Sequence, residues 1–259
     1  MNAGAEPRPE QGTVQAALRF WLPVIVVVLV VRSFLFQPFH IPSGSMMATL
    51  LIGDSLFVSK FSYGYSRYSL PFSPPIFSGR IFASLPSRGD IVVFRSPKDD
   101  SVDLIKRIIG LPGDRIQMVG GHLHINGEPV PRERIEDFVA TEGDFVDSEE
   151  VPGRAIRVRQ WRETLPGGVS HATLDLVNNG QLDDTPVYDV PPGHYFMMGD
   201  NRDDSTDSRV LDEVGYVPFE NIVGRAEIIY FSIGDGAAAW QIWRWPTALR
   251  LRRFFSIIR

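Results

Sequence analysis

An apolar segment near the N-terminus constrains the fold of this chain more than any other feature. The uninterrupted run from Phe20 to Val31 has 12 residues, and its extension through Arg32 to Phe36 gives 17. A helix that crosses a bilayer core of about 30 Å needs roughly 20 residues. The segment therefore fits a single transmembrane anchor if Arg32 snorkels towards the head groups and Trp21 lies at the interface.

Two other interpretations of this segment are open from the residues alone. One is a cleaved signal peptide, because Ser43, Gly44 and Ser45 imitate a small-residue cleavage site, although the stretch before them is bulky. The other is a buried core helix, although the run has no polar face. We favour a retained anchor over residues 18–36 after a polar tail over residues 1–17, with Pro23 in the first turn of the helix.

Composition excludes several functional classes. The chain has 259 residues, of which 44% are hydrophobic and 22% charged, so it suits one large globular domain or two modest ones. The net charge of −5 argues against a nucleic-acid partner, whose phosphates would need Lys and Arg. Because the chain has no cysteine, it has no disulfide framework, thiolate zinc site or cysteine nucleophile.

Short strand patterns separated by turn residues predict a mostly β body. His122–Val130 contains the Asn126-Gly127 pair, which is typical of a β-hairpin. Ser62–Ser87 is rich in Ser, Pro and Gly and predicts a long loop. Further strands are expected at residues 55–60, 88–95, 104–109, 194–199 and 222–231.

The segment from 137 to 189 differs from the rest, since it is acidic, broken by glycines and only weakly periodic. We interpret it as an inserted accessory β subdomain, with strand-like pieces at 155–159 and 171–177. It would divide a catalytic core into residues 37–136 and 190–259. The last part, residues 240–259, combines three tryptophans with five arginines and suits either a core-capping segment or a membrane-surface segment.

Metal sites are poorly supported by the sequence. His122 and His124 share one face of a strand, but no third ligand lies nearby. The acidic run from Asp200 to Asp207 is no calcium loop, because Leu211 stands where the bidentate carboxylate would be. We expect no metal and no cofactor, and instead a polar network at a strand end in which Arg202 and Arg209 pair with the acids of the run.

The stretch FHIPSGSMMATLLIGD, residues 39–54, could be a turn, a cleavage site or the location of a nucleophile. A serine nucleophile needs a base, and no G-x-S-x-G elbow is present. A lysine can serve if an apolar setting keeps it neutral. Lys106 is the candidate, because its same-face neighbours Leu104 and Ile108 are apolar. Taken alone, this pattern fits a solvent-exposed, snorkelling edge lysine better than it fits a buried, neutral general base.

Four motifs in order change that balance. IPSGSMMATLLIGD at 41–54, RGDIVVF at 88–94, DLIKRIIGLPGD at 103–114 and GDNRDDSTDSR at 199–209 closely resemble the conserved boxes of the type I signal peptidases. The resemblance runs from about Val30 to Phe231 and is weakest over 137–189. It implies a mostly antiparallel β catalytic domain with one N-terminal transmembrane helix.

The resemblance implies a catalytic dyad. Ser45 matches the family's nucleophile and Lys106 its general base. Ser43 matches the serine whose hydroxyl forms the oxyanion hole with the backbone N–H of Ser45. No cofactor takes part in this chemistry.

Supporting and substrate-binding residues are also implied. Ser205 matches the serine that orients the lysine, Asp207 and Arg209 match an ion pair, and Asp200 lies in the same box. The positions that would form shallow pockets for the small residues of Ala-x-Ala ends are Phe39, Ile41, Pro42, Met46, Leu50, Val93, Leu104 and Ile105.

The function implied is removal of signal peptides from secretory preproteins at the lipid bilayer. The family places a single-pass enzyme in the bacterial inner membrane, with its tail in the cytoplasm and its catalytic domain on the outer face. Two alternatives stay open: a self-cleaving Ser-Lys protease, which would need a DNA-binding domain in place of the anchor, and an anchored, non-catalytic β domain that binds exported peptides.

Overall fold

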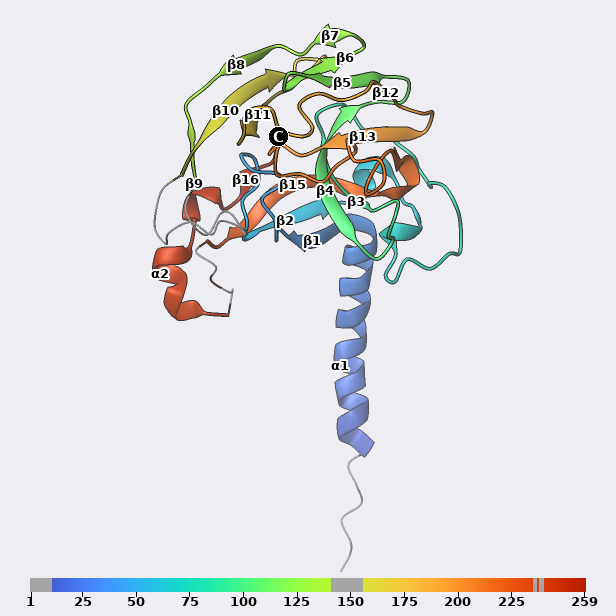
Figure 1. Cartoon of the computed structure of the whole chain (residues 1–259). Coiled ribbons are helices and arrows are strands. Elements are labelled where there is room, and N and C mark those ends of the chain that lie inside the picture. The colour runs from blue at the N-terminus through green and yellow to red at the C-terminus, as the bar shows by residue number, and fades with distance from the viewer. Residues whose placement is uncertain (1–10, 141–155, 235–236, 238–239) are drawn as a thin grey trace, which may run out of the picture.

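The computed structural model describes residues 11–140, 156–234, 237 and 240–259. One long helix projects from a body of antiparallel sheets (Figure 1). Helix α1 spans Gln11–Val30 and continues as a π-helical turn over Val31–Leu35. The segment Gln15–Leu35 is long and apolar enough to cross a membrane, and only 6% of its most apolar window is buried. Pro23 lies inside the helix, so its predicted place in the first turn is wrong. Residues such as Ala16 and Ala17 favour helix and start it earlier.

The main sheet joins the two ends of the chain. Its antiparallel order is β1-β2-β15-β3-β4-β13-β14, with β16 paired to β15. These strands are β1 (Phe36–His40), β2 (Asp54–Ser59), β3 (Ile91–Arg95), β4 (Asp103–Gly110), β13 (His194–Met198), β14 (Val217–Pro218), β15 (Ile222–Ser232) and β16 (Ser256–Ile257). Strand β15, from the C-terminal half of the chain, pairs with β2 on one side and with β3 on the other. The N-terminal and C-terminal halves of the chain therefore form one sheet.

Two smaller sheets cover the far end of the body, away from α1 (Figure 1). One has the order β12-β5-β6-β7, and in the other β10 pairs with β8, β9 and β11. Their strands are β5 (Arg115–Val119), β6 (His122–Ile125), β7 (Glu128–Pro129), β8 (Arg132–Arg134), β9 (Phe138–Ala140), β10 (Ile156–Thr164), β11 (Ser170–Asp175) and β12 (Tyr188–Asp189). The predicted mostly β, antiparallel fold class is confirmed.

Short helical turns fill the connections. The expected loop from 62 to 87 carries 3-10 turns at Phe61–Tyr63 and Arg67–Ser69. Others lie at Phe219–Asn221, Ile242–Arg244 and Leu251–Arg253, and α2 spans Trp245–Ala248.

Most predicted strands are present. Outside residues 137–189, strands β1, β5, β8, β14 and β16 were not predicted. Strand β1 contains Pro38, which suits an edge strand because its missing N–H faces away from β2. The predicted hairpin is confirmed: β6 and β7 pair around Asn126 and Gly127, at φ 58° and 87°. Both residues adopt the left-handed backbone of a type I′ turn.

The expected insertion at 137–189 does not coincide with one sheet. β8 precedes it yet pairs with β10, and β12 pairs with β5 instead. Residues 141–155 lie outside the described part of the chain. The division of the body into a core and an insertion remains a prediction.

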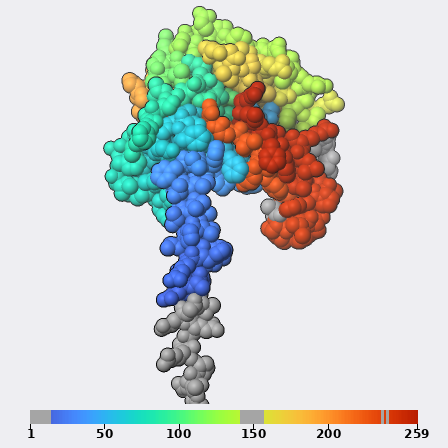
Figure 2. Space-filling model, turned by 180° about the vertical axis from the view of Figure 1, so that it is seen from behind, coloured from blue at the N-terminus to red at the C-terminus, as the bar shows by residue number. Residues whose placement is uncertain are grey.

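The C-terminal segment forms a lobe on the side of the body from which α1 leaves (Figure 2). Trp245 packs with Phe231 against a small core that includes Ile233 and Ala248, so part of this segment caps the body. Trp240 and Trp243 are exposed at 70% and 65%. Contact of these two rings with lipid remains a prediction.

Candidate active site

The Ser45 segment is a compact turn between β1 and β2. Hydrogen bonds from Ile41 N to Asp54 O (2.8 Å) and from Gly53 N to Ile41 O (2.9 Å) close its two ends. Within it, Met47 N donates to Gly44 O at 3.0 Å. Ser45 is 8% exposed, so the turn presents its hydroxyl at the edge of the core.

Lys106 reaches this hydroxyl from β4. Its Nζ lies 2.6 Å from Ser45 Oγ, across 61 positions of sequence. The residue is 4% exposed, and the predicted neighbours Leu104 and Ile108 both pack into one core cluster. The amine therefore points inward, so the snorkelling edge lysine is not what the structure has.

Burial makes Lys106 a usable base. It lowers the pKa of the Lys106 amine to about 8, since the charged form is poorly solvated, and the Arg209 guanidinium acts in the same direction. The carboxylates of Asp207, Asp204 and Asp200 raise the pKa of the Lys106 amine and so partly offset the effect of burial. A neutral amine is thus populated near physiological pH, within hydrogen-bond distance of a serine hydroxyl.

Asp207 links the residues around the dyad. Ser205 Oγ donates to Asp207 Oδ2 at 2.8 Å, and Arg209 Nη2 donates to the same oxygen at 2.9 Å. Burial raises the pKa of the Asp207 carboxyl, but the pairing with Arg209 outweighs it, so the net pKa is lowered. In the described part of the chain, Ser205 has no hydrogen bond to Lys106 and reaches its surroundings through Asp207.

A buried ion pair that the sequence did not indicate lies next to the dyad. Arg107 Nε and Nη2 donate to the two carboxylate oxygens of Asp200 at 2.8 and 2.7 Å. Thr49 Oγ1 also donates to Asp200, at 2.5 Å. The only available signal was the position of Arg107 beside Lys106 on a buried strand, which by alternation sends the two side chains to opposite faces.

The loop after β13 holds the Ser45 turn in place. Asn201 N donates to Ser45 O at 3.1 Å, and Asn201 Nδ2 donates to Gly44 O at 3.2 Å. A Cβ on Gly199 would lie 2.5 Å from Ser45 O and 2.3 Å from Ser205 Oγ. Only glycine allows the three segments to approach this closely.

Arg202 was expected to pair with an acid of its own run, and this was wrong. It forms a bidentate pair with Glu163 of β10, at 3.0 and 2.6 Å. Glu163 is buried. Because the hydrophobic periodicity of its strand is weak, the sequence did not indicate that this side chain points inward. His171 lies beside this pair and beside Asp200, and burial lowers the pKa of its imidazole to about 4.

Ser43 and Ser45 each carry a hydrogen-bond donor that has no acceptor among the described residues. Ser43 is exposed, and neither its hydroxyl nor the backbone N–H of Ser45 has a hydrogen bond within the described residues. If a substrate carbonyl were attacked at Ser45, its developing oxyanion would require donors of this kind.

The expected pocket residues fall into two groups. One core cluster contains Ile41, Met46, Leu50 and Val93, with Phe39 and Ile105 packed against it. Pro42 is exposed, and Leu104 packs against a different cluster. Seven of the eight therefore lie in or beside the Ser45 turn and the adjoining core, whereas Leu104 points elsewhere.

No side chains near the dyad form a metal site. Across the described residues, no group of three or more His, Cys, Asp or Glu side chains is placed to hold a metal ion. His124 Nδ1 lies 3.1 Å from the carbonyl of His122, and His122 is exposed.

Comparison with known proteins identifies the class. Residues 14–231 match the family described as signal peptidase, peptidase S26. The chain therefore belongs to the signal peptidase family, which makes it a serine-type peptidase that cleaves signal peptides.

Two relatives from Rickettsia agree with this assignment. Signal peptidase I of Rickettsia typhi is 41% identical over 250 residues, covering 90% of this chain and 89% of the relative. That of Rickettsia conorii is 41% identical over 249 residues, covering 90% and 88%. A crystal structure of a signal peptidase I from Enterococcus faecalis matches with 25% identity and a TM-score of 0.30, covering 55% of this chain and 97% of that one.

Proposed function

We propose that the chain is a membrane-anchored serine endopeptidase that removes signal peptides from secretory preproteins with a Ser45–Lys106 dyad. The observation that carries this proposal is the distance of 2.6 Å between Lys106 Nζ and Ser45 Oγ, at an amine whose pKa burial lowers to about 8. A base within hydrogen-bond reach of a serine hydroxyl is the geometry of an activated nucleophile.

The first half of the reaction forms an acyl-enzyme. Neutral Lys106 accepts the hydroxyl proton while Ser45 Oγ attacks the scissile carbonyl. The resulting oxyanion is stabilised by Ser43 Oγ and Ser45 N–H, donors worth roughly 10²–10³ in rate when such a hole is preorganised. The lysine ammonium then gives its proton to the leaving amine, and an ester on Ser45 remains.

The second half releases the product. Lys106, neutral again, takes a proton from water, whose oxygen attacks the ester carbonyl. A second oxyanion forms in the same site. As it collapses to the carboxylic acid of the released signal peptide, the C–Oγ bond breaks and the Lys106 ammonium returns its proton to Ser45 Oγ. Asp207, which raises the Lys106 pKa, keeps the amine basic enough to act, and Ser205 holds the Asp207 carboxylate in position.

Specificity for small residues follows from the filled core beneath the dyad. Met46 and Leu50 are fully buried, and Ile41 and Val93 are nearly so. Little depth is left for a substrate side chain, so Ala-x-Ala ends fit and bulky residues clash. The pocket walls are Phe39, Ile41, Pro42, Met46, Leu50, Val93 and Ile105; Leu104 would act only as support.

Helix α1 is proposed as a single-pass anchor in the bacterial inner membrane, with the catalytic domain on the outer face. Its apolar length supports this, since Gln15–Leu35 has 21 residues. Anchoring would hold the dyad near a cleavage site that is itself attached to a membrane-embedded signal peptide.

The test is cleavage of a preprotein by the purified full-length chain in detergent. Ser45→Ala and Lys106→Met should each abolish cleavage after an Ala-x-Ala end. Ser78→Ala and Lys98→Ala, which change exposed residues of the same types, should cleave normally. Circular dichroism checks the fold. Normal cleavage by Ser45→Ala would overturn the mechanism, and no cleavage by the unmodified chain would favour a peptide-binding protein.

A further inference from the structure

A polar pocket opens where the body meets the end of α1. Its volume is about 330 Å³, and its charged walls are the basic Arg32, Lys60 and Arg95 and the acidic Asp100 and Asp103. With Lys60 protonated, the walls carry one excess positive charge. None of these residues belongs to the proposed dyad or to its supporting network.

Lys60 is buried with spare hydrogen-bonding capacity. It is 2% exposed, and its Nζ donates one hydrogen bond within the described residues, to Ser69 O at 2.6 Å. An ammonium has three N–H groups, so two lack acceptors. Burial, helped by Arg32, lowers the pKa of the amine to about 8, although Asp103 raises it. An anion in the pocket would supply the missing acceptors and charge.

Arg95 has the same deficiency. Its Nε lies 3.2 Å from Asp103 Oδ1, but it is buried without a hydrogen bond. The other acid, Asp100, is 3.8 Å from Arg67, so a basic side chain outside the pocket already faces it. Arg32 is exposed in the π-helical turn and is free to turn towards a ligand.

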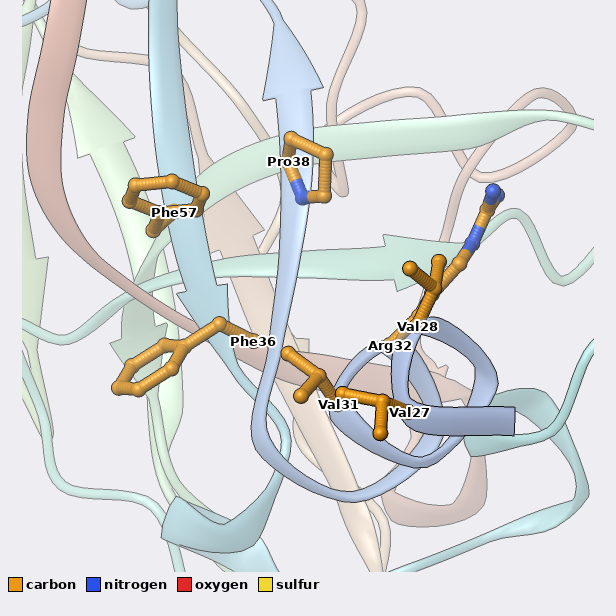
Figure 3. Close-up of a pocket in the computed structure, with 7 residues that line it drawn as sticks. All are labelled: Val27, Val28, Val31, Arg32, Phe36, Pro38 and Phe57. Atoms are coloured by element: carbon orange, nitrogen blue, oxygen red, sulfur yellow. The ribbon is translucent and has the colours of Figure 1, made fainter. Parts of the chain in front are cut away.

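An apolar groove adjoins this pocket. Its volume is about 440 Å³, and it runs between α1 and the first two strands (Figure 3). Val27, Val28 and Val31 line it from the helix, and the strands contribute Phe36, Pro38 and Phe57. Arg32 lines both the groove and the polar pocket, so the two hollows share a wall at this residue.

We propose that the pocket and groove together bind one phosphate-bearing membrane lipid. The phosphate would lie among Arg32, Lys60 and Arg95, and one acyl chain would lie along the groove. A cationic pocket joined to an apolar groove at the end of a membrane-length helix matches the two halves of such a lipid at the depth where it occurs. Phe72, on the pocket wall, is fully exposed and extends the apolar rim.

Other occupants match only one half of the site. A free phosphate leaves the groove unused, and the apolar helix of a signal peptide has no anion for the basic pocket. The inference rests on the proposed bilayer setting of α1, but it needs no part of the dyad.

Native mass spectrometry of the delipidated full-length chain, titrated with dioleoyl phosphatidylglycerol in detergent, tests the proposal. Arg32→Gln and Lys60→Met should each weaken the binding of one lipid about tenfold, as expected when a charge-assisted hydrogen bond is lost. Arg115→Gln removes an exposed arginine that pairs with exposed Asp189, and this variant should bind lipid as the unmodified chain does. Because Arg32 is exposed, Arg32→Gln should fold normally, so it tests the proposal even if the buried change Lys60→Met disturbs the fold.

Two further arms distinguish the sources of phosphate. Val28→Trp fills the groove from the helix and should weaken lipid binding while leaving any binding of inorganic phosphate intact. Phosphate that binds as tightly as lipid would mean a free-anion site. Unchanged lipid binding in Arg32→Gln and Lys60→Met, or one-for-one displacement of lipid by a synthetic signal peptide, would likewise overturn the proposal. Ser45→Ala, measured in the same assay, should bind lipid as the unmodified chain does, because lipid binding needs no catalysis. The lipid proposal and the dyad proposal can therefore fail independently.

Discussion

Asp200 and Arg107 form a fully buried bidentate ion pair immediately beside Lys106, with side chains 1% and 0% exposed. The pair joins the loop that follows β13 to the middle of β4, the strand that carries Lys106. Burial raises the pKa of the Asp200 carboxyl, but Arg107 outweighs it and the net pKa is lowered.

Breaking this pair should destabilise the protein. Asp200→Asn leaves Arg107 charged and without its counterion, which typically costs about 3–5 kcal/mol in a buried pair. Urea unfolding of the detergent-solubilised chain measures the loss. Asp189→Asn removes an 81% exposed carboxylate and should stay within about 0.5 kcal/mol of the unmodified chain. Equal stability of the two variants would contradict the importance of the buried pair.

Cleavage should depend on pH through Lys106. With the pKa of the amine lowered to about 8, the reactive neutral form increases as pH rises through that value. The measured kcat/KM should therefore climb roughly tenfold between pH 7 and a plateau above about pH 9, since about one molecule in ten is neutral at pH 7. A profile that is flat or falling across this range would exclude Lys106 as the base.

Asp207→Asn should move that profile. Asp207 is the leading group that raises the Lys106 pKa, so its neutralisation should shift the rising limb to lower pH. Ser205→Ala keeps the carboxylate and should leave the midpoint nearly in place while lowering kcat. A shift to higher pH in Asp207→Asn would contradict the electrostatic account of the site.

Gly199→Ala should inactivate the enzyme by geometry alone. The added Cβ would meet Ser45 O and Ser205 Oγ at 2.5 and 2.3 Å, so the segments must separate. We expect kcat/KM to fall by about 10² or more, because small misplacements of reacting groups are costly. Gly120→Ala, a glycine at φ 53° with open space around it, should lose about 1 kcal/mol of stability and keep its activity.

The absence of cysteine makes membrane orientation directly measurable. Ser78→Cys, on the body, should react with an impermeant maleimide added outside intact spheroplasts. Thr13→Cys, on the other side of the proposed span, should react only after lysis. The reverse pattern would invert the proposed topology, and labelling of both positions before lysis would argue against a spanning helix.

Elements that depend only on neighbouring residues can be predicted from the amino-acid sequence. The apolar run predicts α1, the Asn126-Gly127 pair predicts its hairpin, and mostly apolar runs predict β4 and β15. Local propensity and side-chain periodicity are enough for these. The order of the motifs was also enough to indicate the family and to name Ser45 and Lys106.

Contacts between residues far apart in the chain could not be predicted and come from the three-dimensional fold. Arg107 with Asp200, Arg202 with Glu163 and the pocket at Lys60 each join residues far apart in the chain. The physical reason is that a buried charge must find a partner somewhere, but its own strand does not specify where. That partner depends on strand order, which places β15 between β2 and β3 and brings both halves of the chain around Ser45.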